Sequence, residues 1–253
     1  MQAYFDNSAT TKPLPEAVEA VSRAMTETWG NPSSLHVIGD TANGELENAR
    51  RTLASAFGCR QQEVYFTGSG TESNNIAVFG TVEALKRRGN RIVTTAVEHP
   101  SVEGCMKRLE NEGFDVVRLP VDKTGQISEE AIYEAVNDKT ILVSLMLVNN
   151  EVGSIMPVKA AAKALKRAGA PGHVHVDAVQ GFGKVPVDLV SADRKASALS
   201  TSRRAPASCP RSSAEDRRTT FVPGPRAHPL SRVSRRPSTP AFCMATSRRT
   251  SPT

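Results

Sequence analysis

Short strand-like segments and longer helix-like segments alternate along this sequence between about residues 63 and 177, and this alternation restricts the fold more than any other feature. Runs typical of strands lie at 63–67, 91–95, 115–119, 140–148 and 173–177. Helical patterns fill the intervals, at 71–88, 99–112, 128–136 and 157–168. Repeated strand–helix units predict a three-layer α/β/α sandwich with a mainly parallel sheet, and ligands bind such sheets beyond the carboxyl ends of the strands. Before this region, the chain is expected to be helical after Pro15.

The composition of the chain changes abruptly near Asp193. Residues 1–193 carry 19 Lys and Arg against 24 Asp and Glu, whereas residues 194–253 carry 13 against 2. The second part holds 8 Pro and only seven large apolar residues. That is too little apolar surface to offset an ordering entropy of about 1–2 kcal/mol per residue. We therefore expect an α/β domain at 1–193, which the resemblance described below implies is incomplete, and a disordered, basic, low-complexity tail at 194–253.

Several classes of protein are not favoured by the composition. Four cysteines at 59, 105, 209 and 243 are widely separated, so the sequence predicts neither a disulfide framework nor a zinc knuckle. No apolar run suits a membrane span and no signal-peptide pattern opens the chain, so we expect a cytoplasmic protein. Paired arginines in the tail could contact nucleic-acid phosphates. Since Phe221 and Phe242 are the only aromatic residues there, a solvated tail is the preferred interpretation.

A glycine-containing turn follows the first predicted strand and opens a helix, in the segment Phe66-Thr67-Gly68-Ser69-Gly70-Thr71-Glu72. Free backbone N–H groups at such a helix start bind anions, phosphate above all. The turn matches neither the Walker A pattern nor G-x-G-x-x-G. Taken alone, an ordinary strand-to-helix turn explains the segment as well as a phosphate cradle does.

The strand His173-Val174-His175-Val176-Asp177 places His173, His175 and Asp177 on one face. Two imidazoles and a carboxylate could bind zinc or iron, but no further ligand is evident and we predict no metal site. A second interpretation packs the histidines in the sheet and makes Asp177 a loop cap. A third makes Asp177 the acidic partner of a heterocycle's protonated nitrogen.

Two more polar motifs follow predicted strands. Asn149-Asn150-Glu151-Val152-Gly153 comes after the most apolar strand, and its amides suit a bound oxygen, although a simple turn explains it equally well. Glu98-His99-Pro100 brings an imidazole to the same edge of the sheet. A lone histidine is more often structural, but three polar motifs at one edge favour a site there.

Together, six separated motifs resemble the cysteine desulfurases, which are pyridoxal-phosphate (PLP) enzymes of the class V aminotransferase group with the fold type I architecture. The resemblance runs from about residue 3 to Asp193. Its motifs are Asp6-Asn7-Ser8-Ala9-Thr10-Thr11, Gly30-Asn31-Pro32-Ser33-Ser34-Leu35-His36, Thr71-Glu72-Ser73-Asn74-Asn75, Glu98-His99, Asn149-Asn150-Glu151-Val152-Gly153 and Asp177-Ala178-Val179-Gln180.

The resemblance implies a role for each candidate residue. Gly70 and Thr71 would hold the cofactor phosphate, and Asp177 would pair with the protonated ring nitrogen. His99, the implied catalytic residue, would stack on the ring and shuttle protons. The remaining implied contacts are those of Gln180 and Asn150 with the ring hydroxyl, and of Asn7 and Asn150 with the substrate.

The implied reaction converts L-cysteine to L-alanine and passes the sulfur, as an enzyme persulfide, to an acceptor or scaffold protein. Iron–sulfur cluster assembly, or assembly of another sulfur-containing cofactor, and a homodimer are implied with it. The alternatives are another class V enzyme, such as a selenocysteine lyase or an aminotransferase, and a non-catalytic remnant with a basic, anion-binding tail.

The sequence departs from the family where the cofactor lysine is expected. That lysine lies in a Ser-x-His-Lys motif about eight to ten residues after the pair aligned with Ala192-Asp193, and the motif is absent here. Lys195 comes too early, and Lys184 lies in a separate connecting segment. The later substrate arginine and the mobile-loop cysteine are also missing by pattern. A frameshift near Ser200 would explain the tail, and we expect little or no desulfurase activity from the chain as written.

Overall fold

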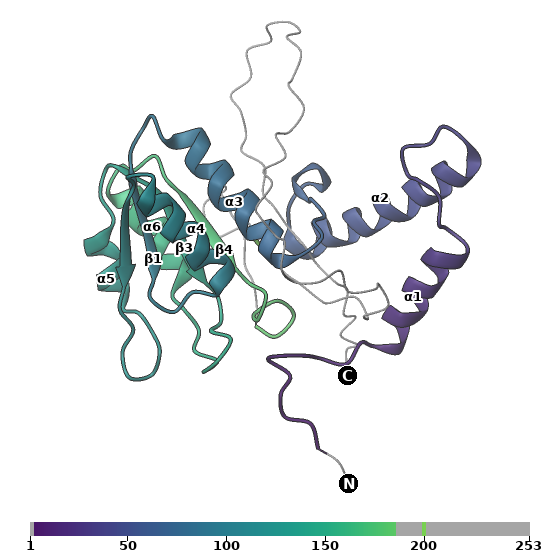
Figure 1. Ribbon diagram of the computed structural model, residues 1–253, viewed down its shortest axis with the longest axis horizontal. Coiled ribbons are helices and arrows are strands. Elements are labelled where there is room, and N and C mark those ends of the chain that lie inside the picture. Colours follow the sequence, from purple (N-terminus) through teal and green to yellow (C-terminus); the bar gives the residue numbers. More distant parts are fainter. Residues whose placement is uncertain (1–2, 186–198, 201–253) are drawn as a thin grey trace, which may run out of the picture.

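The computed structural model describes residues 3–185 and 199–200, which are the coloured parts of Figure 1. Of the predicted tail at 194–253, Leu199 and Ser200 are described, and they form a short strand of the sheet. The predictions for the residues after Ser200 lie outside the described residues. The same holds for the predicted domain boundary near Asp193 and for Lys195. These expectations stay predictions.

The core of the fold is one parallel sheet. Its strands are β1 (Arg91–Thr95), β2 (Asp115–Leu119), β3 (Thr140–Met146), β4 (His173–Asp177) and β5 (Leu199–Ser200). They lie in the order β2-β1-β3-β4-β5, and every neighbouring pair is parallel. The predicted α/β class with a mainly parallel sheet is confirmed. The strand order reverses its direction between β1 and β3, which is where open α/β sheets bind ligands.

Helices cover both faces of the sheet. On one face, α3 (Gly70–Leu85) and α4 (Pro100–Asn111) pack in an apolar cluster with β1 and β3. On the other face, α5 (Glu129–Ala135) and α6 (Val158–Arg167) join a larger cluster with the same strands and β4. All seven residues of β3 are buried, as expected of a central strand with both faces covered. The layers therefore follow from the apolar runs of the sequence.

Two N-terminal helices extend from the sheet region, and Figure 1 shows them at the far side of α3. In α2 (Val37–Phe57), the last turns pack into the larger cluster through Leu53, Ala54 and Phe57. Gly58 ends this helix in the left-handed conformation, with a φ of 63°. In contrast, α1 (Pro15–Thr26) has no buried residue.

The predicted strand at 63–67 is wrong. A short 3₁₀ helix, η1 (Gln61–Glu63), comes first, and an irregular extended segment follows it. Side chains bind this segment locally: the Glu63 carboxylate accepts the Arg60 backbone N–H at 2.8 Å, and the Arg50 guanidinium donates to the Val64 carbonyl. Of the apolar residues in the run, Val64 is buried in the core, whereas Tyr65 and Phe66 are exposed.

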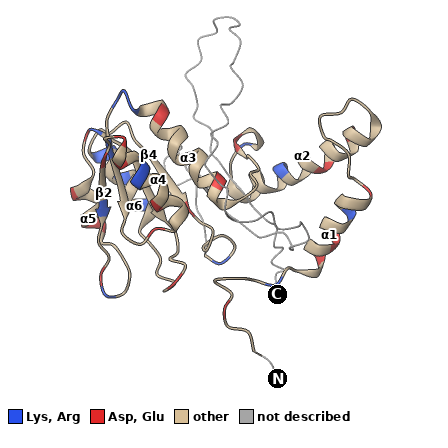
Figure 2. Cartoon of the chain, in the orientation of Figure 1, with Lys and Arg blue, Asp and Glu red and all other residues tan. Residues whose placement is uncertain are grey.

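No helix among the described residues is both long enough and apolar enough to cross a membrane. In the view of Figure 2, acidic and basic residues are interspersed over the helices and strands of the described region. Mixed charge of this kind is typical of a solvated protein surface.

Candidate functional site

The polar motifs gather where β1, β3 and β4 end. Glu98 and His99 follow β1, Asn149 and Asn150 follow β3, and Asp177 is the last residue of β4. Parallel strands bring these ends to one edge of the sheet, and the reversal of strand order lies between β1 and β3. The candidate site therefore occupies the place that the fold prepares for a ligand.

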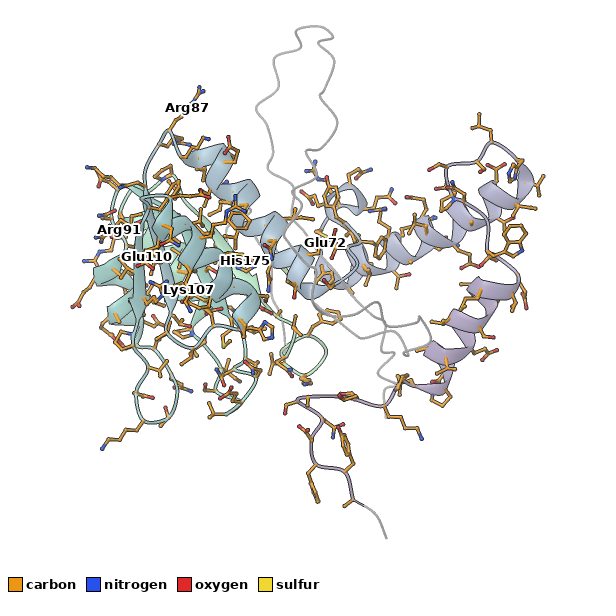
Figure 3. The ribbon with its side chains drawn as sticks, viewed as in Figure 1. Glu72, Arg87, Arg91, Lys107, Glu110 and His175 are labelled. Carbon is orange, nitrogen blue, oxygen red and sulfur yellow. The ribbon has the colours of Figure 1, made fainter. Side chains whose placement is uncertain are left out.

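The N-terminus of α3 forms the turn predicted to bind an anion. Ser69 caps the helix by accepting the Glu72 N–H at 3.2 Å, and the Glu72 carboxylate accepts the Gly68 N–H at 2.6 Å. Figure 3 shows Glu72 at this end of α3 and Arg87 at the opposite end. Thr71 is exposed in the first turn, whereas Gly70 is buried. The positive end of the helix dipole thus already holds one carboxylate.

The Asp177 carboxylate is buried and held at both oxygens. Oδ2 accepts from the Asn74 side-chain amide at 2.8 Å, and Oδ1 accepts from the Val179 backbone N–H at 3.0 Å. Asp177 is only 6 % exposed. Since Asn74 lies about one helical turn after Gly70, this bond connects the carboxylate to the start of α3.

His175 lies inside the sheet as a neutral imidazole. Its Nδ1 lies 2.8 Å from Ser144 Oγ, and its Nε2 lies 3.1 Å from Asn74 Oδ1. Burial lowers the pKa of His175 to about 4, although the nearby Asp177 opposes the shift. No group of three potential metal ligands occurs among the described residues. His175 is thus a hydrogen-bonding group of the interior.

The loop after β1 is fixed by Glu98. One carboxyl oxygen, Oε1, accepts from Thr95 Oγ1 at 2.8 Å and from the Met146 backbone N–H at 2.9 Å. The other oxygen, Oε2, is buried and has no hydrogen-bond partner among the described residues. Burial raises the pKa of Glu98 to about 8, and the negative charge of Asp177 adds to this shift. Glu98 therefore holds the loop as a neutral acid at neutral pH.

His99 is exposed at the start of α4. Its Nδ1 accepts the Ser101 backbone N–H at 3.1 Å and lies 2.8 Å from Ser101 Oγ. These contacts to Nδ1 assign the ring proton to Nε2, the nitrogen on the other side of the ring. The ring is thus fixed in one tautomer with its donor nitrogen available to a ligand.

A hollow of about 310 Å³ lies beside these strand ends. Gln180 lines it and donates to the Ser8 carbonyl at 2.8 Å, and Lys184 lines it and donates to Gln180 Oε1 at 2.9 Å. The complete lining consists of Ser8, Val148, Asn149, Asn150, Glu151, Val152, Gly153, Gln180 and Lys184. It thus offers amide groups, one carboxylate and one amine to a ligand.

The predicted site residues fall into two groups. Asn150 and Gln180 line the hollow, and Asn7 is exposed beside Ser8 without lining it. Asp177 and His99 belong to a second group that hydrogen bonds join through Asn74 and Ser101. Gly70 and Thr71 lie one turn before Asn74.

Sequence reasoning assigned no role to Asn74, Ser101 or Glu98. The available signal for Asn74 was its position on the apolar face of α3, between Gly70 and the buried residues Ala77 and Val78. A polar residue there requires hydrogen-bond partners in the interior.

The described thiols are poor sulfur carriers. Burial raises the pKa of Cys105 to about 11, and its Sγ donates to the Ser101 carbonyl at 3.2 Å. Burial also raises the pKa of Cys59, and the charge of Glu63 adds to that shift. Since the thiolate is the nucleophile, neither group is activated.

Comparison with known proteins identifies the relatives of this chain. The sequence pattern of the class-V aminotransferases matches residues 3–201. A NifS/IcsS protein homolog of Lactobacillus delbrueckii subsp. bulgaricus is 50% identical over 192 residues, covering 76% of this chain and 49% of that protein. The cysteine desulfurase IscS of Methanosarcina thermophila is 44% identical over 186 residues, covering 74% and 46%. The chain thus spans about half the length of these curated relatives.

Solved structures show the same likeness. A NifS-like protein superposes with a TM-score of 0.73 at 39% identity, covering 76% of this chain and 53% of that one. DndA from Streptomyces lividans gives a TM-score of 0.65 at 41% identity, covering 75% and 52%. SspA, whose structure is a complex with cysteine, gives 0.70 at 29% identity, covering 79% and 57%.

Proposed function

Because the chain belongs to the class-V aminotransferase family, we propose that the whole protein is a PLP-dependent cysteine desulfurase that converts L-cysteine to L-alanine. Its sulfur would pass to an enzyme thiol as a persulfide and then to an acceptor or scaffold protein. Relatives named cysteine desulfurase, at 41–44% identity over the same region, support the reaction. The complex of SspA with cysteine supports the substrate.

The polar groups of the site fit the polar parts of pyridoxal phosphate, the cofactor of this family. The N-terminus of α3 suits the phosphate, because helix starts bind anions. Asp177, buried and oriented by two N–H donors, suits the protonated ring nitrogen. The amides of Asn150 and Gln180 suit the ring hydroxyl, since both line the hollow. The oriented Asp177 carboxylate is the single observation that carries the proposal.

When bound, the cofactor would supply an electron sink for the bonds around the substrate's α-carbon. The chain's own residues provide the surroundings for that chemistry. Asp177 would bind the protonated ring nitrogen through its oriented carboxylate, and His99 holds its proton on Nε2, where it can donate to a ligand. Asn150 presents its amide to the hollow in which the substrate would lie.

We also propose a homodimer, cytoplasmic localisation and a role in iron–sulfur cluster assembly or a related sulfur transfer. The support for a further subunit or domain is the exposed apolar surface of α1 and its flanking segments. The sulfur-transfer role rests on the named relatives.

Titration of the purified chain with PLP, followed by absorbance and by fluorescence quenching, tests the cofactor site. We expect saturable binding that Asp177→Asn weakens by about tenfold or more, because a hydrogen bond to a charged group is lost. Asp122→Asn is the matched control, since Asp122 is an exposed loop carboxylate whose partners among the described residues belong to its own turn. An equal affinity of the wild type and Asp177→Asn would refute the assignment.

A further inference from the structure

We propose that Asn74 is the positioning residue of this site: its one amide group fixes the Asp177 carboxylate, the tautomer of His175 and, through Ser101, the ring of His99. The role toward a bound cofactor rests on the proposed function. The hydrogen-bond geometry stands independently of it.

Asn74 uses the full hydrogen-bonding capacity of its amide nitrogen. Nδ2 donates one bond to Asp177 Oδ2 at 2.8 Å and one to Ser101 Oγ at 2.9 Å. Oδ1 lies 3.1 Å from His175 Nε2 and accepts from it. The opposite amide orientation would place two oxygens against each other at Asp177, so the partners determine the orientation.

The surrounding bonds all run in one direction. Ser144 O–H donates to His175 Nδ1, and His175 Nε2–H donates to Asn74. Ser101 accepts from Asn74, so its own O–H is free to donate to His99 Nδ1 at 2.8 Å. A chain of donors therefore runs from the middle of β3 through β4 and α3 to the first turn of α4. Bonds aligned in this way strengthen one another.

The free-energy cost of burying this amide argues against a role in packing alone. Asn74 is 1 % exposed, and a buried amide is tolerated when its partners are present. An apolar residue of similar size would leave the Asp177 oxygen and the His175 N–H unpaired in the interior. An aspartate would place a second carboxylate against Asp177 and would donate no hydrogen bond.

The position of Asn74 explains how the hydrogen-bond network would serve the site. The residue lies one turn after Gly70, at the end of α3 assigned to the phosphate. Asp177 and His99 are assigned to the ring. Asn74 lies in the first turns of α3 and is bonded to Asp177 and, through Ser101, to His99. The start of this helix and one amide therefore determine the distance between the phosphate end and the ring end of the site.

Asn74→Asp removes the donor with little change of shape, and Asn48→Asp makes the same chemical change at an exposed position of α2. Asn48 Oδ1 accepts from the Arg51 guanidinium of its own helix at 3.0 Å, a bond that aspartate keeps. We expect Asn74→Asp to weaken PLP binding by about 10- to 100-fold and Asn48→Asp to change it by less than about twofold. Equal effects of the two variants would overturn the proposal.

A second readout needs no cofactor. Imidazole ¹⁵N shifts should show the Nε2–H tautomer for His99 and His175 in the wild-type chain. Asn74→Ala should free the His175 ring to change tautomer. Ser101→Ala should remove the side-chain donor to His99 Nδ1, shift the ¹⁵N signal of that nitrogen and leave His175 unchanged, while the Ser101 backbone N–H still holds the His99 ring. Ser101→Ala also serves if Asn74→Ala does not fold. The proposal fails if Ser101→Ala alters both rings or neither. If the wild type shows these shifts as expected but does not bind PLP, the proposed function is refuted and the positioning role of Asn74 in the network is not.

Discussion

At the scale of single residues, Glu98 is an acid that the fold keeps protonated. Its pKa is about 8 in the folded chain and 4.5 in a solvated reference, because its carboxyl group is buried. Between about pH 4.5 and 8 the unfolded chain releases a proton that the folded chain retains. Stability therefore falls as the pH rises through this window and levels off above it.

Glu98→Gln should remove this pH dependence, because the amide keeps an oxygen for Thr95 and Met146 but does not ionise. We expect the variant to be more stable than the wild type at pH 8–9 and to show a flatter profile. Urea unfolding from pH 5 to 9 measures the effect, with the exposed Glu130→Gln as a control. Parallel profiles for wild type and Glu98→Gln would contradict the assignment of a neutral acid.

His175 has the opposite dependence. Its pKa is lowered from 6.5 to about 4 by burial, so the unfolded chain binds a proton between these values that the folded chain does not. Stability should therefore fall as the pH drops from about 6.5 toward 4. Proton NMR should show the ring of His175 neutral down to about pH 5. A midpoint near 6.5 would show that the ring is hydrated and that the Asn74 network is open.

At the scale of elements, the capping of α3 should affect ligand binding as well as stability. Ser69→Ala removes the N-cap bond to Glu72, and Ser128→Ala removes the equivalent bond to Ala131 in α5, at 3.1 Å. Each change should lower the free energy of unfolding by about 1 kcal/mol. Only Ser69→Ala should also weaken binding of PLP, measured by fluorescence titration. Equal binding by the two variants would show that the start of α3 is not the anion site.

The strands show how much of the fold the local sequence can predict. The bounds of β1, β2 and β4 agree with their prediction, because apolar runs between polar turns are a local signal. The run 63–67 has the same composition, but no pairing of it within the described sheet was observed. Pairing depends on distant strands, and here the Arg50 guanidinium donates to the Val64 carbonyl in place of a neighbouring strand.

The residues of the site likewise include some whose positions the local sequence predicts and some whose partners it does not. The positions of Asp177 and Asn150 were predictable because Asp177 ends one strand, Asn150 follows another, and parallel strands end at one edge. The Asn74 bonds join residues 101 and 103 positions apart, to His175 and Asp177. Such partners depend on how α3 packs on the sheet, which residue spacing along one chain does not reveal.

At the scale of the whole molecule, the N-terminal helices present apolar side chains to solvent. Val18, Val21 and Met25 of α1 and the nearby Trp29 are between 49 % and 72 % exposed. We expect the isolated chain to self-associate through this surface, and Val21→Lys with Met25→Lys to reduce that association in sedimentation velocity. Because neither side chain is buried, the unfolding free energy should change little. Unchanged association would place the contact elsewhere.

The chain as written should release little sulfide from L-cysteine in the presence of PLP. Of the described lysines, Lys184 is the one that lines the hollow, and its amine is bonded to Gln180. The described thiols, Cys59 and Cys105, have raised pKa values and little thiolate at neutral pH. The matched comparison is a version whose residues after about Leu199 are translated from the neighbouring frame, assayed for alanine and sulfide. Turnover of at least about a hundredfold more is expected from that version, since a covalent cofactor amine and a reactive thiol act together in such enzymes. Comparable turnover by the two would instead show that a lysine of this chain, Lys184 or Lys195, performs the amine chemistry, and Lys184→Ala and Lys195→Ala would show which of them does.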